Sequence, residues 1–241
     1  MNWLSRTQLL LGKERLEKLQ NSHVLVAGLG GVGAYAAEQL CRAGIGEMTL
    51  IDGDVVEETN KNRQLPAVDS NLGKPKAEVM AARFREINPD IRLHVFNEFL
   101  KDDRMIEVLK LRRYDYVVDA IDTLAPKVFL IYHALQQGYP VVSSMGAGGK
   151  LDPLQVRVAD ISQSYHCRLA KMLRKRLHKL NVYRGVEVVF SAEKVNPEAM
   201  IVCESAHKKS NVGTISYMPA IFGCLCAWVV VRDIMPVACM R

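Results

Sequence analysis

A glycine-rich segment near the N-terminus constrains the fold of this chain more than any other feature. The segment Val26-Ala-Gly-Leu-Gly-Gly-Val-Gly33 follows an apolar, strand-like run over 23–27 and precedes a run with helical periodicity over 31–43. Glycines permit positive φ angles and close approach of the backbone to a phosphate, while a helix N-terminus offers N–H groups and partial positive charge. We therefore expect a nucleotide-phosphate site lined by Gly28, Gly30, Gly31 and Gly33.

Strand-like and helical runs alternate over the first 150 residues. Helices are expected over 13–20, 74–87 and 126–137, and further strands over 48–52, 93–96, 114–118 and 140–144. Strict alternation implies parallel strands joined by right-handed crossovers, and unbroken apolar strands imply a sheet covered on both faces. The sequence therefore predicts an α/β, Rossmann-like fold with a mostly parallel sheet and helices on both faces.

The regular alternation of strand-like and helical runs ends at about residue 151. We expect a strand over 155–159, a helix over 169–180, shorter strands over 186–191 and 199–202, and a polar loop over 204–211. The apolar run 217–231 is interrupted by Pro219 and Gly223 and is short for a bilayer span, which favours a buried helix. The prediction is one domain over 1–241, with a nucleotide-binding core (1–150), a substrate-facing and RNA-facing part (151–216) and a C-terminal helix (217–241).

Candidate nucleotide ligands follow the predicted strands, because ligands of such sheets bind beyond the carboxyl ends of the strands. Asp52 ends the second strand at about the place where an acceptor for a ribose hydroxyl belongs. A triphosphate needs more cationic groups than a pyrophosphate, and Arg63 and Lys76 can supply them, with Asp122 as a ligand for Mg²⁺. This set favours ATP over a dinucleotide, although Arg63 or Lys76 taken singly fits an ordinary surface charge equally well.

The combined pattern resembles the ubiquitin-activating enzyme superfamily, which includes the bacterial ThiF, MoeB and HesA adenylating enzymes. It consists of the glycine turn, Asp52-x-Asp54, Asn60-x-x-Arg63-Gln64, Lys76 and Asp119-x-x-Asp122. The resemblance implies that Asp52 binds the ATP ribose with Asp54 beside it. It implies that Asn60, Arg63 and Lys76 bind phosphates and stabilise charge on the α-phosphate, and that Asp122 binds Mg²⁺. It also implies a homodimer in which Arg6 reaches the site of the partner.

A second element narrows the substrate. Gly146-Ala-Gly-Gly-x-x-Asp-Pro-x-Gln155 is similar to the tRNA threonylcarbamoyladenosine dehydratases, and this resemblance extends over essentially the whole chain. It implies a cytoplasmic, ATP-dependent ligase or cyclase that adenylates the threonyl carboxylate of a modified adenosine beside the anticodon. The carbamoyl group then closes a ring with release of AMP and net loss of water. Ring closure within one molecule needs little covalent assistance from an enzyme.

A basic segment provides independent support for an RNA substrate. The range 161–186 contains no Asp or Glu, and its expected helix places Lys171, Arg174 and Lys175 on a face away from a leucine stripe, with Lys179 close behind. The stripe consists of Leu169, Leu173 and Leu177. A basic helical face suits a phosphate backbone, although most charge runs are only solvated surfaces. The formal net charge of +6 agrees with a polyanionic partner without requiring one.

Other functions remain open at this stage. The N-terminal sequence has no features of a signal peptide, which indicates a cytoplasmic protein with reduced thiols. The six cysteines include no CxxC pair, so we expect no structural zinc, and Cys203 fits a buried small side chain better than a nucleophile. The first alternative is adenylation of a ubiquitin-like sulfur carrier, with a sulfur-relay or other accessory partner. The others are an NAD-dependent oxidoreductase and a nucleotide-regulated RNA-binding protein.

Overall fold

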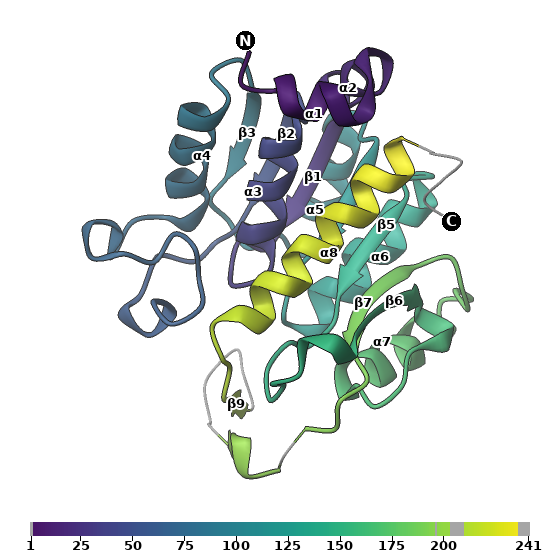
Figure 1. Ribbon diagram of the computed structural model, residues 1–241. Helices are drawn as coiled ribbons and strands as arrows, with labels where there is room; N and C mark the ends of the chain where they lie inside the picture. The colour runs from purple at the N-terminus through teal and green to yellow at the C-terminus, as the bar shows by residue number, and fades with distance from the viewer. Residues whose placement is uncertain (1, 196, 203–209, 236–241) are drawn as a thin grey trace.

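The computed structural model describes residues 2–195, 197–202 and 210–235, and its centre is a twisted, seven-stranded sheet (Figure 1). The strands of this sheet are β1 (His23–Ala27), β2 (Glu47–Ile51), β3 (Arg92–Phe96), β4 (Tyr116–Asp119), β5 (Val141–Ser144), β6 (Val156–Asp160) and β7 (Glu187–Ser191). Their order is β3-β2-β1-β4-β5-β7-β6. β6 is antiparallel to β7, whereas the other neighbours pair in parallel. Two short strands, β8 (Met200–Val202) and β9 (Ser210–Val212), pair separately.

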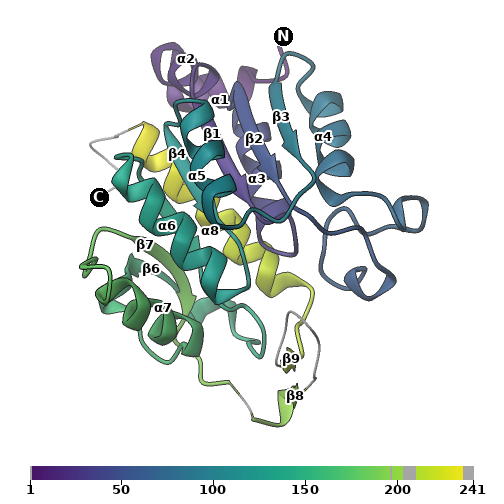
Figure 2. The ribbon, with the colours of Figure 1, turned by 180° about the vertical axis from the view of Figure 1, so that it is seen from behind.

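Helices cover both faces of the main sheet. They are α1 (Ser5–Leu11), α2 (Lys13–Gln20), α3 (Gly33–Ala43), α4 (Lys76–Ile87), α5 (Asp102–Leu111), α6 (Leu124–Gln136), α7 (Arg168–His178) and α8 (Tyr217–Ile234). One face packs on α3, α4 and α8 (Figure 1). The opposite face packs on α5, α6 and α7 (Figure 2). This arrangement confirms the predicted fold class.

The central strand shows why both faces must be covered. Successive side chains of a strand point to opposite faces. On β1, Val24 and Val26 enter the core under α3 and α8, whereas Leu25 and Ala27 enter the core under α5 and α6. Their burial is complete or nearly so, as expected for a parallel sheet enclosed between two helical layers.

Two helices were not predicted. Helix α1 contributes no buried residue, so its sequence lacks the apolar periodicity that would identify it. Helix α5 buries Met105, Val108 and Leu109, a correct helical spacing confined to a segment of ten residues. Helix α7 also differs in detail, because its buried stripe consists of Ala170, Leu173 and Leu177. Leu169 is only partly buried in this arrangement.

Helix α8 is long enough to cross a bilayer, contrary to the estimate from the run 217–231, but its burial confirms the predicted core helix. Among the described helices it is the one that is long and apolar enough to cross a bilayer by length and composition. Phe222, Cys226 and Val230 are nevertheless completely buried, and the helix packs along α3. Gly223 makes this packing possible, since a Cβ there would lie 2.4 Å from the Val32 carbonyl oxygen. The helix therefore belongs to the core, as predicted.

Candidate active site

The glycine-rich turn is held so tightly that two of its positions exclude side chains. Gly28 has a φ of +87°, and a Cβ there would lie 2.8 Å from the carbonyl oxygen of Ala120. A Cβ on Gly33 would lie only 1.7 Å from the carbonyl oxygen of Gly28. The turn is therefore packed tightly between β1, α3 and the end of β4, and only glycine fits at these two positions.

Asp52 links the turn to the second strand. Its Oδ2 accepts a hydrogen bond of 2.5 Å from the Leu29 N–H, and its Oδ1 accepts one of 2.8 Å from the Asp54 N–H. Burial raises the pKa of this carboxyl group, while these backbone N–H groups and the nearby Lys76 ammonium oppose the rise. Asp52 therefore lies against the glycine-rich turn, at the end of the second strand, as the sequence analysis predicts.

Lys76 joins the same cluster from the first position of α4. Its Nζ lies 2.9 Å from Asp54 Oδ2, and its backbone N–H donates to the Asp54 carbonyl at 3.0 Å. Only 4% of the Lys76 residue is exposed, so this is no solvated surface lysine. An ammonium has three donors, which allows Lys76 to contact Asp54 and a phosphate oxygen together.

The segment 60–64 lies across the turn. Asn60 is buried, and its Oδ1 accepts from the Glu57 N–H at 3.1 Å, which fixes the 3₁₀ turn Glu58–Asn60. Arg63 Nη1 donates to the Thr59 carbonyl at 3.0 Å and to Asn62 Oδ1 at 2.8 Å.

Gln64 carries a buried side-chain oxygen that could accept a hydrogen bond from a ligand. Its side chain faces Gly30, where a Cβ would lie 3.8 Å from Gln64 Nε2. Gln64 Oε1 is buried, and within the described residues it has no hydrogen-bond partner. A buried acceptor without a donor costs free energy. The orphaned oxygen beside the glycine-rich turn therefore fits a bound molecule that carries N–H or O–H groups, as a nucleotide does.

A buried ion pair supports the loop that carries Asp122. The Asp119 carboxylate is completely buried and contacts Lys127 Nζ at 2.7 Å, Ser143 Oγ at 2.6 Å and the Ile121 N–H at 3.1 Å. Lys127 also donates to the Ile121 carbonyl at 2.8 Å. Burial raises the pKa of Asp119, whereas Lys127 and Ser143 counteract the rise. Asp122 itself is exposed and lies between the two members of this pair in sequence, three residues after Asp119.

The structure does not bring Arg6 to the glycine-rich turn of its own chain. Arg6 lies on α1, next to Leu4, whose side chain would be 3.2 Å from a Cβ on Gly44. Gly44 precedes β2, so α1 lies at the end of the sheet where the strands begin (Figure 1). The glycine-rich turn lies at the opposite end. An Arg6 role in nucleotide binding thus requires a second copy of the chain.

Sequence reasoning missed the residues that fix the loops around the site. The sequence did offer a sign that Lys127 is buried, because it is the one lysine in the apolar helix α6. Lys150 is buried, donates to the Glu193 carbonyl, and has its pKa lowered by burial. The loop preceding it is tied to the segment before α8, since the Gly149 N–H donates to the Gly213 carbonyl at 2.8 Å. No local pattern in the sequence indicates that last contact.

Two of the described cysteines, Cys41 and Cys226, are poor nucleophiles. Burial raises the pKa of the Cys41 and Cys226 thiols to about 12, which keeps both protonated at neutral pH. Cys203, the one cysteine considered as a nucleophile, lies outside the described residues.

The basic helix and a neighbouring hollow form a second surface. Lys171, Lys175 and Lys179 are exposed, and in the described parts of the chain no carboxylate forms an ion pair with them. Arg174 differs, because its Nη1 donates to the carbonyls of Ile161 and Ser164 at 3.3 and 2.8 Å.

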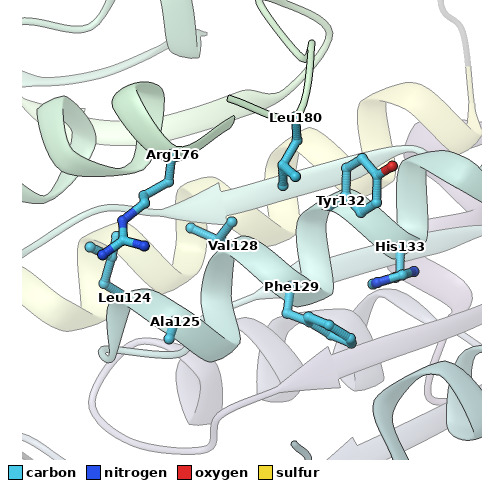
Figure 3. Close-up of a pocket in the computed structure, with 8 residues that line it drawn as sticks. All are labelled: Leu124, Ala125, Val128, Phe129, Tyr132, His133, Arg176 and Leu180. Carbon is cyan, nitrogen blue, oxygen red and sulfur yellow. The ribbon is translucent and has the colours of Figure 1, made fainter. Parts of the chain in front are cut away.

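An apolar hollow of about 330 Å³ lies between α6 and α7, bordered by Phe129, Tyr132 and Arg176 among others (Figure 3). Its lining includes no residue of the glycine-rich turn.

Comparisons with known proteins identify the family of this chain. The ThiF family model matches residues 4–236. The tRNA threonylcarbamoyladenosine dehydratase of Bacillus subtilis is 37% identical over 98% of this chain and 95% of its own length. That of Escherichia coli is 43% identical over 78% of this chain and 72% of its own. The crystal structure of the Escherichia coli enzyme TcdA in complex with ATP superposes with a TM-score of 0.87 at 37% identity, covering 97% of this chain and 93% of TcdA. The chain belongs to the ThiF family and, within it, to the group of tRNA threonylcarbamoyladenosine dehydratases.

Proposed function

We propose that this protein catalyses the ATP-dependent cyclisation of N6-threonylcarbamoyladenosine in tRNA, with net loss of one water. The observation that carries the proposal is the gathering of Asp52, Lys76 and Gln64 around the glycine-rich turn. It occurs in a chain that matches such dehydratases over nearly its full length.

In the first step of the proposed reaction, the threonyl carboxylate is activated. A carboxylate oxygen attacks the α-phosphorus of ATP, the bond to the β-phosphate oxygen breaks, and pyrophosphate leaves. Asp52 accepts hydrogen bonds from the ribose hydroxyls, with Asp54 positioning Lys76. Asn60, Arg63 and Lys76 bind phosphate oxygens and stabilise the charge that develops there. The carboxylate of Asp122 would hold Mg²⁺, which neutralises phosphate charge when it is bound.

In the second step, the carbamoyl group attacks the activated acyl carbon. The bond to AMP breaks, AMP leaves, and the carbamoyl group releases one proton as the ring closes. Nucleophile and electrophile belong to one molecule, so the step is effectively unimolecular. The raised pKa values of Cys41 and Cys226 agree with a route that uses no thiolate. In the loop that follows β5, we assign the backbone N–H groups of residues 146–148 to contacts with the adenylate, because those of Met145 and Gly149 donate to the carbonyls of Val189 and Gly213.

We also infer that a homodimer forms, acting on tRNA in the cytoplasm. On α1, Leu9 and Leu10 are 87% and 81% exposed, an apolar surface beside Arg6 that suits a contact with a second copy. Such a contact would let Arg6 reach the site of the partner.

The exposed lysines of α7 provide the surface proposed for tRNA. We expect the double variant Lys171→Glu and Lys175→Glu to bind tRNA at least about tenfold more weakly at low salt, since phosphate contacts dominate such affinities. The slope of log affinity against log salt should also become shallower, by roughly 0.7–0.9 for each lost phosphate contact. Fluorescence anisotropy across a salt series measures both quantities.

The matched control reverses Lys13 and Lys18, two exposed lysines of α2 at the other end of the molecule. Arg174 is left intact because its hydrogen bonds to backbone carbonyls stabilise the fold. Equal affinity of both double variants and the wild type would remove α7 from the RNA surface. The reaction itself is tested by the mass of the modified nucleoside, which must fall by one water in the presence of ATP.

A further inference from the structure

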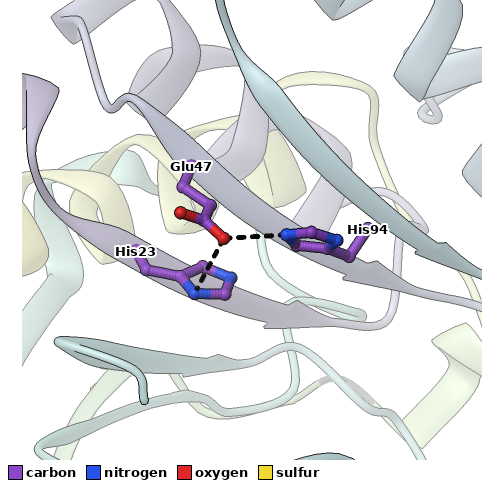
Figure 4. Close-up of side chains that lie close together, drawn as sticks. All are labelled: His23, Glu47 and His94. Carbon is purple, nitrogen blue, oxygen red and sulfur yellow. Dashed lines mark hydrogen bonds and ion pairs between the residues drawn. The ribbon is translucent and has the colours of Figure 1, made fainter. Parts of the chain in front are cut away.

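Two histidines and a glutamate converge at the end of the sheet opposite the glycine-rich turn (Figure 4). His23 and Glu47 are the first residues of β1 and β2, and His94 is the third of β3. The parallel register pairs His23 with Glu47 and Thr49 with His94. Because every second residue of a strand faces the same side, all three side chains emerge on one face of the sheet.

The distances between their polar atoms match those between ligands of one small ion. Glu47 Oε1 lies 2.8 Å from His94 Nε2 and 3.5 Å from His23 Nδ1. The three ligand atoms all lie within 4.8 Å of one another. A tetrahedral Zn²⁺ ion, with bonds of about 2.0–2.1 Å, holds its nitrogen and oxygen ligands about 3.3 Å apart. Small rotations of these side chains would therefore accommodate an ion between them.

Neighbouring groups already orient two of the three side chains, His23 and Glu47, for this purpose. His23 Nε2 lies 2.9 Å from Thr49 Oγ1, so Nδ1 is the nitrogen turned toward Glu47. Arg92 donates to Glu47 Oε2 from Nε and Nη2, at 3.0 and 2.9 Å, which leaves Oε1 between the imidazoles. Such outer hydrogen bonds are typical of groups that support metal ligands.

A hollow beside the cluster leaves room for a further ligand. It measures about 420 Å³ and borders His23 and Glu47 together with Arg112 and Asp115. The Asp115 carboxylate accepts a hydrogen bond of 2.8 Å from the backbone N–H of His23 and adds negative charge near the cluster, where Arg112 adds positive charge. A water molecule entering from the hollow could complete the coordination of an ion.

We propose that His23, Glu47 and His94 bind one divalent transition-metal ion, of which Zn²⁺ fits best. Two imidazole nitrogens and one carboxylate oxygen suit Zn²⁺ rather than Mg²⁺, which prefers oxygen ligands and octahedral geometry. This differs from the expectation of no structural zinc, which rested on cysteine pairs alone. The ion would tie β1, β2 and β3 together at the end of the sheet remote from the nucleotide. Its binding is independent of the proposed reaction.

Calorimetric titration of the chelator-stripped, full-length protein with Zn²⁺ alone tests the proposal. We expect one ion per chain, and a melting temperature higher by roughly 5–10 °C when free zinc exceeds the dissociation constant a hundredfold. Glu47→Gln and His94→Gln should each weaken binding at least about tenfold. His178→Gln removes an exposed histidine of α7 and should leave binding unchanged.

Substitution with Co²⁺ identifies the ligands. Visible d–d bands without a near-ultraviolet sulfur-to-metal band indicate nitrogen and oxygen ligands, whereas a sulfur band would assign the ion to cysteines and overturn the proposal. Absence of zinc binding would overturn it as well. So would unchanged affinity in both Glu47→Gln and His94→Gln. Each of these variants lies at a partly exposed position, and its metal-free melting curve shows whether it is folded.

Discussion

Substitution of Asp122 with alanine is expected to reduce AMP formation by about a hundredfold or more while the protein stays folded. A metal ion that neutralises phosphate charge contributes several kcal/mol to a transition state, and loss of its carboxylate ligand forfeits that contribution. Asp122 is exposed and is not a member of the buried Asp119–Lys127 pair, so alanine at this position leaves that pair in place. AMP release from ATP under single-turnover conditions measures the effect.

The control for this variant is Asp103→Ala. Asp103 is also an exposed aspartate, in the first turn of α5, and it is remote in sequence from every candidate ligand. The account expects AMP formation by Asp103→Ala to equal that of the wild type. More than a tenth of wild-type AMP formation by Asp122→Ala would count against its proposed role with Mg²⁺.

Replacing Lys127 with methionine should have the largest effect on stability. The substitution leaves the Asp119 carboxylate fully buried without its cation, and breaking a buried ion pair in this way costs about 3–5 kcal/mol. At about 2–4 °C per kcal/mol for a chain of this size, the melting temperature should fall by roughly 6–20 °C. Thermal unfolding followed by circular dichroism measures the loss.

A second substitution distinguishes an uncompensated charge from simple misfitting of the methionine side chain. Lys127→Met combined with Asp119→Asn removes the buried negative charge and should recover part of the lost stability. Lys110→Met, at an exposed position of α5, is the matched control and should change the melting temperature little. A double variant as unstable as Lys127→Met would show that the charge of Asp119 is not the cause.

The extent to which the sequence determines this fold differs between its elements. Strand β1, the glycine-rich turn and helix α3 were predictable because their signals are local: an apolar run, the glycine spacing and a helical periodicity. Helix α1 was not, since it buries none of its residues and therefore carries no periodic signal. The pairing of β6 with β7 in the antiparallel direction depends on the path of α7 between them, which no short sequence pattern encodes.

In the candidate site, too, some residues have local sequence signals, whereas others are brought together only by the fold. Asp52 contacts the turn, as the rule for the carboxyl ends of parallel strands predicts, and Lys76 joins it through Asp54. Their roles toward ATP stay predictions. The Asp54–Lys76 bond and the orphaned oxygen of Gln64 depend on side-chain packing, which emerges only in three dimensions. His23, Glu47 and His94 come from three strands and meet through strand register, so their separation in sequence concealed them.

AMP release from ATP, with purified protein and tRNA that carries or lacks the threonylcarbamoyl group, tests the proposed function most directly. The account predicts AMP release only with the modified tRNA, accompanied by loss of one water from the nucleoside. AMP release only with a small carrier protein ending in Gly-Gly would instead assign the site to sulfur-carrier activation. Binding of modified tRNA and ATP without any AMP release would contradict the account, because it would leave a nucleotide-regulated RNA-binding protein without the adenylation step.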